Sequence, residues 1–486
     1  MDINALSNMR VLVVGLGREG TALAAYLAAH GLSVTATDQQ AASQLGDSMA
    51  TLAQAGVSLV LGEHPHALLD EVDILFVSPG IPLEAPFLEE ARRRNLPLCT
   101  ESKLFCLLCP ALIVGITGSN GKTTTATLVA EMVKASGRTV WLGGNIGQPL
   151  IEMVDDIQPD DVVVLELSSF QLEYFHAKLN QAVDVTQIAN VEDEVLQALL
   201  GDWSPPVAAI LNITPNHLDR HPSMKHYVRA KRSLINYQGR GGRLIMNLDN
   251  DMTRTIGNQF GAKTRWFSLE AQLANGAALV GKTLALFDEA ENVETIANLS
   301  EVKLRGIHNQ SNILAACLIS REVGASLEAM RQVVTTFTGV NHRLQFVREL
   351  AGVGYYNDSI ATSPERLSAA LRSFNEPLVL LAGGRDKHLP WDETARLMVH
   401  KAKDIILFGE AAPVIAEALA QAQAEVVLAK TNVYSQADLS EAVAVAHQVA
   451  TTGSVVLLSP GCTSFDAYPD YEGRGEHFKI LVLELE

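Results

Sequence analysis

Short apolar runs recur along the chain and alternate with longer stretches whose apolar residues are spaced as on one face of a helix. The run 162–165 is apolar at every position, whereas the apolar residues of 126–134 recur at helical spacing. A strand that is apolar throughout has both faces buried, and helices on the two sides of a mostly parallel sheet provide that burial. The pattern therefore predicts an α/β fold. The predicted strands are Arg10–Val14, Ser33–Thr37, Val72–Val77, Ala111–Val114, Thr139–Leu142, Asp161–Leu167, Val207–Asn212, Arg243–Asn247, Leu378–Ala382, Asp404–Phe408 and Ser454–Ser459.

The alternation falls into three segments, and a chain of 486 residues has room for about three domains of ~150 residues. We predict an N-terminal Rossmann-like domain in 1–110, a central domain of the P-loop ATPase type in 111–338, and a C-terminal Rossmann-like domain in 339–486. The stretch 337–342 is the expected boundary between the last two domains.

The most informative segment is a glycine-rich loop at 115–125, between a predicted strand and a predicted helix. Backbone N–H groups of such a loop and the positive end of the helix face an anion, so the arrangement predicts a phosphate site. Lys122 adds a positive charge, and the Thr123 hydroxyl is placed to ligate the Mg²⁺ of a nucleotide. The loop departs from the G-x-x-x-x-G-K-[ST] pattern, because Ile116 occupies the first glycine position. A glycine-rich turn without a ligand is the alternative, and the flanking strand and helix disfavour it.

A second glycine motif, G-x-G-x-x-G at 15–20, follows the first predicted strand, and Asp38 follows the second. This arrangement is typical of dinucleotide-binding folds. Taken alone it is compatible with NAD, but the sequence downstream contains no pattern typical of hydride transfer.

Composition limits the classes of function. A formal net charge of −18 argues against nucleic acid as a partner, while 48% hydrophobic and 19% charged residues are typical of a globular enzyme. No apolar run reaches the ~18 residues of a membrane-spanning helix, and the N-terminus lacks the order of a signal peptide. Five cysteines, an odd number, do not suggest a disulfide framework. We therefore expect a cytoplasmic protein.

Three further positions are candidates for the same site as Lys122. Glu166 ends an apolar strand, where a carboxylate suits Mg²⁺ but could also be an ordinary strand-end acid. His217 follows another strand and could ligate a metal, position a phosphate, or only cap or pack. Lys231 lies fourteen residues further on, and its spacing alone is compatible with a solvated helix charge.

Several motifs occur in an order that resembles the ATP-dependent Mur ligases of peptidoglycan synthesis, over essentially the whole chain. They are GSNGKTT at 118–124, GNIG at 144–147, LELSSFQLE at 165–173, HLDR at 217–220, HNQSN at 308–312, HR at 342–343, NDS at 357–359 and LSPGCTSFD at 458–466. The last motif is similar to that of the member that adds glutamate to UDP-N-acetylmuramoyl-L-alanine. The resemblance implies ATP and Mg²⁺ as cofactors and a two-step reaction. The substrate carboxylate first takes the γ-phosphate of ATP, and the amine of glutamate then displaces phosphate.

The resemblance also assigns roles to residues. The catalytic positions are Lys122, Glu166, His217 and Lys231. The metal positions are Thr123, Glu166, His217 and, if it is carbamylated, Lys231. The ATP-binding positions are Gly118, Ser119, Asn120, Gly121, Lys122, Thr123, Thr124, Asn309, Asn312, Arg343 and Asp358. The positions for the UDP-substrate, expected in the first domain in place of NAD, are Gly17, Arg18, Asp38, Ser78, Pro79, Gly80, Asn145 and His217. The glutamate positions are Thr362, Lys387, Ser464, Phe465 and Tyr471. Addition of CO₂ to a lysine needs a neutral amine, so the site must lower the pKa of Lys231.

The chain departs from the motifs of the family at two places. The family often has lysine where Ile360 stands, so a positive charge is missing beside the expected glutamate site. We expect Arg385 to replace it in part, and His388 is the other candidate by sequence. Asn216 stands where an acid is common, so no carboxylate is expected there. The pocket residues are compatible with either enantiomer of glutamate.

Three alternatives stay open. They are a sibling Mur ligase that adds another amino acid, a folylpolyglutamate synthetase, and a non-catalytic protein that senses ATP or UDP-sugar. The folate enzymes lack a domain like 10–80, the diamino-acid ligases use an Asp-Asn-Pro-Arg motif that this chain lacks, and a sensor would not need all four catalytic positions. We expect a monomer whose third domain closes about a hinge near 338–341.

Overall fold

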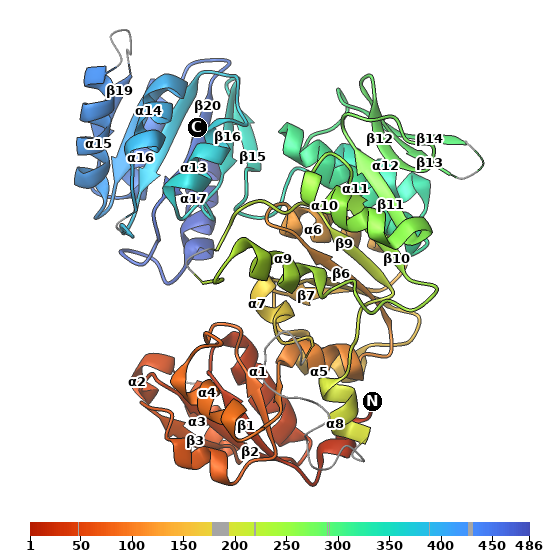
Figure 1. Ribbon diagram of the computed structural model, residues 1–486. Coiled ribbons are helices and arrows are strands. Elements are labelled where there is room, and N and C mark those ends of the chain that lie inside the picture. Colours follow the sequence, from red (N-terminus) through yellow and green to blue (C-terminus); the bar gives the residue numbers. More distant parts are fainter. Residues whose placement is uncertain are drawn as a thin grey trace. The chain divides into compact units, whose positions relative to one another are not determined.

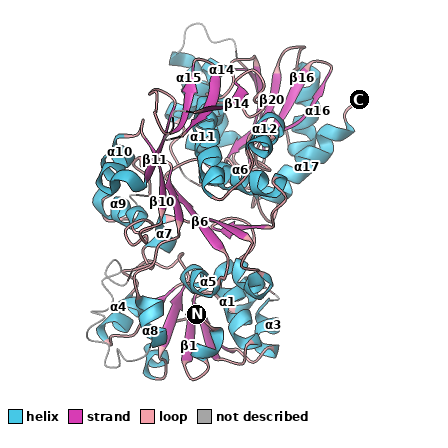
Figure 2. Cartoon of the chain, turned by 90° about the vertical axis from the view of Figure 1, so that its right-hand side faces the viewer, coloured by secondary structure: helices cyan, strands magenta, loops and turns pink. Residues whose placement is uncertain are grey.

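The computed structural model describes residues 1–46, 48–176, 194–217, 220–288, 290, 292–387, 389–425 and 431–486. The chain folds into two compact units (Figure 1). The first unit comprises Met1–Val302 and His308–Thr335, and the second comprises Lys303–Ile307 and Thr336–Glu486. Both contain mostly parallel sheets with helices packed on them (Figure 2), which confirms the predicted α/β class. Among the described helices, none combines the length and the apolarity needed to cross a bilayer.

The N-terminal sheet is parallel and has the order β3 (Ser58–Leu61), β2 (Ser33–Asp38), β1 (Arg10–Val14), β4 (Ile74–Val77) and β5 (Leu98–Cys99). In β1, Val11 and Val13 pack in the apolar cluster that includes Leu23 of α1, whereas Leu12 and Val14 pack in another cluster. Both faces of the strand are therefore buried, as its composition requires. The helices of this part are α1 (Arg18–Ala29), α2 (Ala42–Leu45), α3 (Ser48–Gln54), α4 (Pro86–Arg93) and α5 (Glu101–Leu108), with the 3₁₀ segments η1 (Ile3–Leu6) and η2 (His66–Asp70).

The central sheet belongs to the same compact unit. Its order is β7 (Val140–Gly144), β8 (Val162–Glu166), β6 (Leu112–Thr117), β9 (Val207–Ile210), β10 (Arg243–Asn247), β11 (Thr264–Ser268), β12 (Gly276–Val280), β13 (Thr283–Phe287) and β14 (Val293–Asn298). The strands from β7 to β12 are parallel, so the carboxyl ends of β6, β8 and β9 lie at one edge. The helices are α6 (Lys122–Ala135), α7 (Ser169–Leu172), α8 (Glu194–Leu200), α9 (Met224–Arg232), α10 (Asp251–Gly257), α11 (Ile307–Glu322) and α12 (Leu327–Thr336), with η3 (Leu150–Asp156) and η5 (Asn258–Lys263).

The antiparallel strands β12, β13 and β14 are absent from the strands predicted above. In the structure β12 and β13 form a hairpin in which Val280 pairs with Thr283, so that only Gly281 and Lys282 form the loop. Gly281 has a φ of 61°, a value that two-residue hairpin loops commonly need at their first position and that glycine adopts without strain. The Gly281–Lys282 pair between two apolar runs was the sequence feature that could have predicted this hairpin.

The second compact unit contains a six-stranded sheet. Its order is β15 (Gln345–Leu350), β16 (Val353–Asn357), β20 (Val455–Gly461), β17 (Leu378–Gly383), β18 (Ala402–Phe408) and β19 (Asn432–Ser435), and only the pair of β15 with β16 is antiparallel. In β17, Leu378 and Leu380 pack on one face of the sheet, and Val379 and Leu381 pack on the other. The helices are α13 (Pro364–Leu371), α14 (Asp392–Lys401), α15 (Ala412–Glu425), α16 (Leu439–Val449) and α17 (Tyr471–Glu484).

Candidate active site

A phosphate loop, Gly118–Lys122, joins the end of β6 to the first turn of α6. Gly121 has a φ of 84°, which glycine adopts readily, and a Cβ at this position would lie 2.2 Å from Oδ1 of Asn312 on α11. Just beyond the end of the neighbouring strand β9, the carbonyl of Asn212 accepts a hydrogen bond from the backbone N–H of Ser119 at 2.9 Å. Two elements therefore fix the backbone of the loop in one conformation.

A polar cluster connects the phosphate loop with the end of β8. The hydroxyl of Thr123 donates to Oε2 of Glu166 at 2.7 Å, and the side-chain amide of Asn145 donates to Oε1 of the same carboxylate at 2.9 Å. The ammonium of Lys122 donates to the carbonyl of Gly118 at 3.1 Å and so lies over its own loop. A hydroxyl and a buried carboxylate are the oxygen ligands that Mg²⁺ prefers, so these residues fit a Mg²⁺–nucleotide.

Lys231 is the buried cation of the site. It projects from α9 with 2% of its surface exposed, and its Nζ donates to the carbonyl of Gly118 at 2.8 Å and contacts the Thr117 hydroxyl at 3.4 Å. Burial first, and then the positive charge of Lys122, lower the pKa of Lys231 well below its ordinary value, while Glu166 opposes the shift. Burial and a neighbouring cation are both effects that favour the neutral form of a lysine amine.

His217 lies beyond β9 in a left-handed backbone conformation, with a φ of 55°. Its ring packs edge-on against Phe170, with 5.1 Å between the ring centroids. Its carbonyl accepts hydrogen bonds from the backbone N–H groups of Arg220 and His221. The two residues between, Leu218 and Asp219 of the predicted motif, lie outside the described residues.

A cavity of about 310 Å³ lies between loops of the N-terminal sheet and loops of the central sheet, within the first compact unit. Its walls combine two arginines, one glutamate, small polar residues and one aromatic ring, which suits a polar ligand. The lining residues are Arg18, Glu19, Ser78, Pro79, Gly80, Asn145, Ser168, Phe170 and Arg220.

Arg220 holds the two walls of this cavity together. Its guanidinium donates to the carbonyls of Pro79 and Ile81 at 2.8 Å each and to that of Gly80 at 3.1 Å. The same group lies 4.5 Å from the ring centroid of Phe170, a cation–π distance. A loop of the N-terminal sheet is thereby fixed to the segment that follows His217.

Three domain models of one protein family match the chain in order. The Mur ligase MurD-like N-terminal domain matches residues 9–100, the Mur ligase middle domain matches residues 116–320, and the Mur ligase glutamate ligase domain matches residues 342–462. The chain belongs to the Mur ligase family. It is 42% identical over 474 residues to a UDP-N-acetylmuramoylalanine–D-glutamate ligase of Symbiobacterium thermophilum, with 97% of each chain covered. An enzyme of the same name from Clostridium novyi is 37% identical, with 99% of this chain and 98% of the relative covered.

Two solved structures show the same fold as this Mur ligase. A pseudomurein peptide ligase of type C from Methanothermus fervidus aligns with a TM-score of 0.54 at 18% identity and covers 99% of this chain and 100% of its own. A UDP-N-acetylmuramate–alanine ligase from Thermotoga maritima aligns with a TM-score of 0.55 at 16% identity and covers 98% of this chain and 99% of its own. At these identities the likeness supports the fold alone, and it is the three domain matches that show three domains of the Mur ligase type.

The first unit of this Mur ligase brings many of the predicted site residues together. The predicted Arg18, Ser78, Pro79, Gly80 and Asn145 line one cavity, and Asn145 also contacts Glu166. Asp38 instead accepts a hydrogen bond from the N–H of Leu16 at 2.6 Å and so braces the glycine loop at 15–20. Glu19, Ser168, Phe170 and Arg220 were not assigned to the cavity from the sequence. Ser168 and Phe170 lie in the quoted motif LELSSFQLE, and Arg220 lies in HLDR. Membership of these motifs was the sequence feature that could have identified them.

Of the predicted nucleotide residues, the two asparagines of α11 belong to the first unit. The side-chain amide of Asn312 donates to Oδ1 of Asn309 at 2.9 Å, beside Gly121. Arg343 and Asp358 belong to the second unit, where Asp358 accepts from the Leu344 N–H at 3.1 Å and from a serine hydroxyl at 2.8 Å. Burial raises the pKa of Asp358 to about 7.

The predicted glutamate residues lie on loops of the second unit. The backbones of Arg385 and Thr463 are paired by two hydrogen bonds, at 2.9 and 3.0 Å, so the loops after β17 and β20 lie side by side. These loops contain Lys387, which is exposed, and Ser464, which is buried. Phe465 is 60% exposed, and Tyr471 begins α17.

Arg385, expected to replace the charge missing at Ile360, is paired with another group. Its guanidinium makes two hydrogen bonds to the carboxylate of Glu410, at 2.9 and 3.0 Å, and both side chains are about half exposed. His388, the other candidate, lies outside the described residues. The carboxylate of Glu410 largely neutralises the charge of Arg385. That Arg385 replaces the charge missing at Ile360 therefore stays a prediction, which these contacts do not support.

Arg474 is a buried cation to which sequence reasoning assigned no role. Its guanidinium donates to the carbonyls of Ser359, Cys462 and Thr463 at 2.9 to 3.1 Å, and it has no exposed surface. It therefore joins the segment before Ile360 to the loop that contains Ser464. The quoted motif LSPGCTSFD ends at Asp466, so it did not include this residue.

Proposed function

We propose that this Mur ligase joins D-glutamate to UDP-N-acetylmuramoyl-L-alanine and converts ATP to ADP and phosphate in the same reaction. The observation that supports this most directly is the hydrogen-bonded series Thr123–Glu166–Asn145. It begins at the phosphate loop and ends in the wall of the cavity. A phosphate donor and a carboxylate acceptor would meet along this series.

The first step of the proposed reaction uses the cations at the phosphate loop. The substrate carboxylate attacks the γ-phosphorus of ATP, the bond to the β-phosphate oxygen breaks, and ADP leaves. Lys122 holds the transferred phosphoryl group by charge, and Mg²⁺, when bound at Thr123 and Glu166, neutralises further phosphate charge. Asn145 orients the Glu166 carboxylate while it also faces the cavity.

The second step makes the amide. The glutamate amine attacks the carbonyl of the acyl phosphate, the C–O bond to phosphate breaks, and the amine proton is released. Lys387 would pair one carboxylate of glutamate, with Thr362, Ser464, Phe465 and Tyr471 around it. Lys231 would ligate the metal as a carbamate, because its lowered pKa favours the neutral amine that adds CO₂.

The same proposal includes the organisation of the chain. The first domain, 1–110, binds the UDP-substrate, the second, 111–338, binds ATP, and the third, 339–486, binds glutamate. The enzyme acts as a monomer in the cytoplasm, where ATP is available.

The decisive experiment is phosphate release by the purified full chain with ATP, Mg²⁺ and UDP-N-acetylmuramoyl-L-alanine. Release that depends on D-glutamate supports the proposal, and release that depends only on L-glutamate or on another amino acid contradicts it. Glu166→Gln should abolish the release because it removes a charge at the metal position, and Glu131→Gln, an exposed change on α6, is the matched control.

A further inference from the structure

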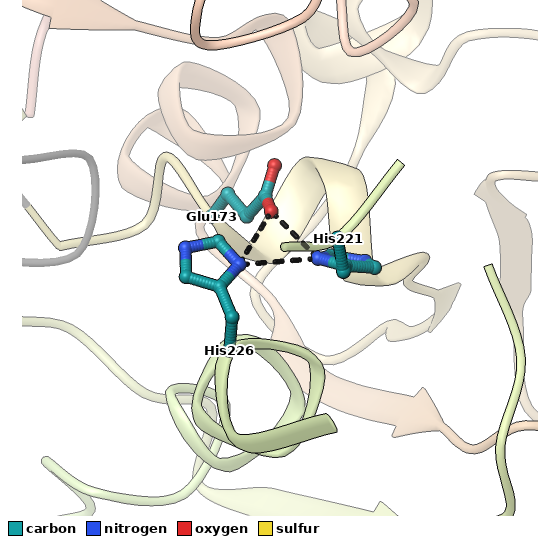
Figure 3. Close-up of side chains that lie close together, drawn as sticks. All are labelled: Glu173, His221 and His226. Atoms are coloured by element: carbon teal, nitrogen blue, oxygen red, sulfur yellow. Dashed lines mark hydrogen bonds and ion pairs between the residues drawn. The ribbon is translucent and has the colours of Figure 1, made fainter. Parts of the chain in front are cut away.

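Two histidines and a glutamate meet next to Phe170 of the cavity wall, in a cluster that the ligase chemistry does not use. Figure 3 shows Glu173, which follows α7, facing His221 and His226, the latter on the first turn of α9. Oε1 of Glu173 lies 2.9 Å from Nδ1 of His221 and 3.4 Å from Nδ1 of His226, and the two nitrogens are 3.2 Å apart. We call these three residues the His–Glu cluster.

The three distances match the edges of a tetrahedral metal site. With metal–ligand bonds of ~2.0 to 2.1 Å, the ligand atoms of a tetrahedral zinc ion are about 3.3 to 3.4 Å apart. The observed distances of 2.9, 3.2 and 3.4 Å require shifts of only a few tenths of an ångström. Two imidazoles and one carboxylate are a ligand set that zinc and similar divalent ions accept.

The surroundings of His221 are compatible with the tautomer that a metal needs. Its Nε2 lies 2.8 Å from the hydroxyl of Ser169, which can accept a proton from Nε2 and so leave the lone pair of Nδ1 for a metal ion. Without a metal, Nδ1 donates its proton to the carboxylate of Glu173 at 2.9 Å, and a metal ion would take the place of that proton. A second hydrogen bond of this kind fixes the ligating ring in many metal sites.

Access to the cluster comes from one side. The side chains of His221 and Glu173 are 0% and 6% exposed, whereas that of His226 is 22% exposed. An ion would enter beside His226 and retain water as its fourth ligand. The cluster differs in chemistry from the oxygen-rich set of Thr123 and Glu166, because nitrogen ligands favour transition metals over Mg²⁺.

We propose that Glu173, His221 and His226 form a structural binding site for a divalent transition-metal ion such as Zn²⁺. The ion would join α7 to α9, the helix that also contains Lys231. A metal at this place stabilises the folded state in proportion to its binding free energy.

The test is titration of the purified full chain with Co²⁺ in the presence of excess Mg²⁺, which keeps the oxygen-rich site occupied. The expected result is one Co²⁺ per chain with the intense visible absorption of a tetrahedral nitrogen–oxygen site, and a raised Tm. His226→Gln should weaken Co²⁺ binding at least about 10-fold, since it removes a ligand. Absence of the absorption in the unchanged protein, or equal affinity in His226→Gln, would overturn the proposal.

The matched control is His30→Gln. His30 is also a partly exposed histidine, 3.1 Å from the carboxylate of Asp155 but without a second histidine, so its loss should leave Co²⁺ binding unchanged. Glu173→Gln gives a second ligand variant in case His226→Gln alters the fold, and it should weaken Co²⁺ binding in the same way.

A different observation, in the second unit, concerns how glutamate is held, and it rests on the proposed function. Glutamate has two carboxylates, and Lys387 is the only cation among the predicted glutamate positions. On the first turn of α13, Arg366 is exposed, and its Nη1 donates to the carbonyl of Ile360 at 3.1 Å. Its positive charge also lowers the pKa of Lys387, second to the effect of burial, so the two cations face a common region.

The geometry points to Arg366 as the residue that binds the second carboxylate of glutamate. Its guanidinium is held at Ile360, beside Thr362, and can pair with a carboxylate in two parallel hydrogen bonds. Arg385, in contrast, already has Glu410 as its partner.

Steady-state kinetics with D-glutamate test this role. Arg366→Ala should raise KM for glutamate about 10- to 100-fold, the effect of losing a charged hydrogen-bonded pair, and leave KM for ATP unchanged. Arg372→Ala, an exposed change at the end of the same helix, is the matched control. Ile360→Lys in the Arg366→Ala protein should restore part of the loss.

The outcomes separate the two proposals. If the unchanged enzyme shows no glutamate-dependent phosphate release, the proposed function itself fails. If it does show release but KM for glutamate is equal in Arg366→Ala, only the role of Arg366 is wrong.

Discussion

At the scale of single residues, the site depends on one lysine kept in an environment that disfavours its charge. Lys231 is buried, lies near Lys122, and meets backbone and hydroxyl oxygens through its amine. Its sequence spacing alone indicated nothing beyond a solvated helix charge, because burial and a neighbouring cation arise from tertiary packing. Only the resemblance to a family pointed to this residue.

Lys231→Arg tests whether a neutral amine is needed. Arginine keeps the positive charge but cannot lose its proton, so phosphate release should fall at least about 100-fold, or roughly 3 kcal/mol of transition-state stabilisation. The assay is initial-rate phosphate release, with Tm measured to exclude misfolding. Lys225→Arg on the exposed side of the same helix should keep the full rate. A Lys231→Arg enzyme of normal rate would contradict the carbamate role.

Glu19, a half-buried residue of the cavity wall, and the buried Glu101 form a pair of carboxyl groups with a predictable pH dependence. Burial raises the pKa of Glu19 to about 7, and burial together with the charge of Glu19 raises the pKa of Glu101 to about 8. The side-chain amide of Gln171 donates to Glu19 at 2.8 Å and to the Ser102 hydroxyl at 3.1 Å, which connects the pair.

Because the folded state holds these protons more tightly than the unfolded state, the free energy of unfolding should fall as the pH rises from about 5 to 8. Glu101→Gln removes one of the titrating groups, so between pH 6 and 8.5 its Tm should fall less than that of the unchanged protein, by roughly 2 °C or more. Thermal unfolding at a series of pH values measures this. Parallel Tm curves for the two proteins would contradict it, and Glu131→Gln, at an exposed position, is the control.

At the scale of elements, the phosphate loop shows which parts of the fold follow from local sequence. Its strand, glycines and helix start were predicted because each has a local signature. The contact of Gly121 with Asn312 was not predictable in this way, since α11 lies far along the chain and reaches the loop only in the folded sheet. The hairpins formed by β12, β13 and β14 were not predicted either, because they interrupt the alternation of strand and helix.

Gly121→Ala separates this contact from backbone strain. The added Cβ would stand 2.2 Å from Asn312 Oδ1, so the affinity for a non-hydrolysable ATP analogue should fall at least about 10-fold, or roughly 1.4 kcal/mol. Gly137→Ala is the control, because Gly137 has a similar φ of 80° and nothing within 4 Å of its Cβ position. Isothermal titration calorimetry measures both. Equal losses in the two variants would mean that strain, not the contact, is responsible.

At the scale of the whole molecule, the N-terminal and central sheets form one compact unit because side chains of each contact the other. Arg220 is the central example, with three backbone carbonyls of 79–81 and the ring of Phe170 around its guanidinium. The sequence pointed to five of the nine residues that line the cavity, but it did not predict this connection, because a motif does not show which distant carbonyls its arginine contacts.

Arg220→Ala should therefore weaken the binding of the UDP-substrate without changing that of ATP. The loss of a buried wall of the cavity and of three charged hydrogen bonds should reduce affinity about 10- to 100-fold. Binding of UDP-N-acetylmuramoyl-L-alanine, measured by calorimetry, gives the result, with Arg240→Ala as a control at an exposed position. An unchanged affinity would show that the loop of 79–81 keeps its place without Arg220.

The short segment Lys303–Ile307 belongs to the second unit, although both of its neighbours in the sequence belong to the first. Its Arg305 packs over the rings of Tyr356 and Phe374 and pairs with Glu376. Exchange of C-terminal domains between relatives, in the laboratory or by recombination, would therefore fail at a single junction near 336. A functional chimaera needs two crossovers, one on each side of Arg305, in addition to the one at the start of the domain, so this domain is inherited together with a piece of chain that lies before it.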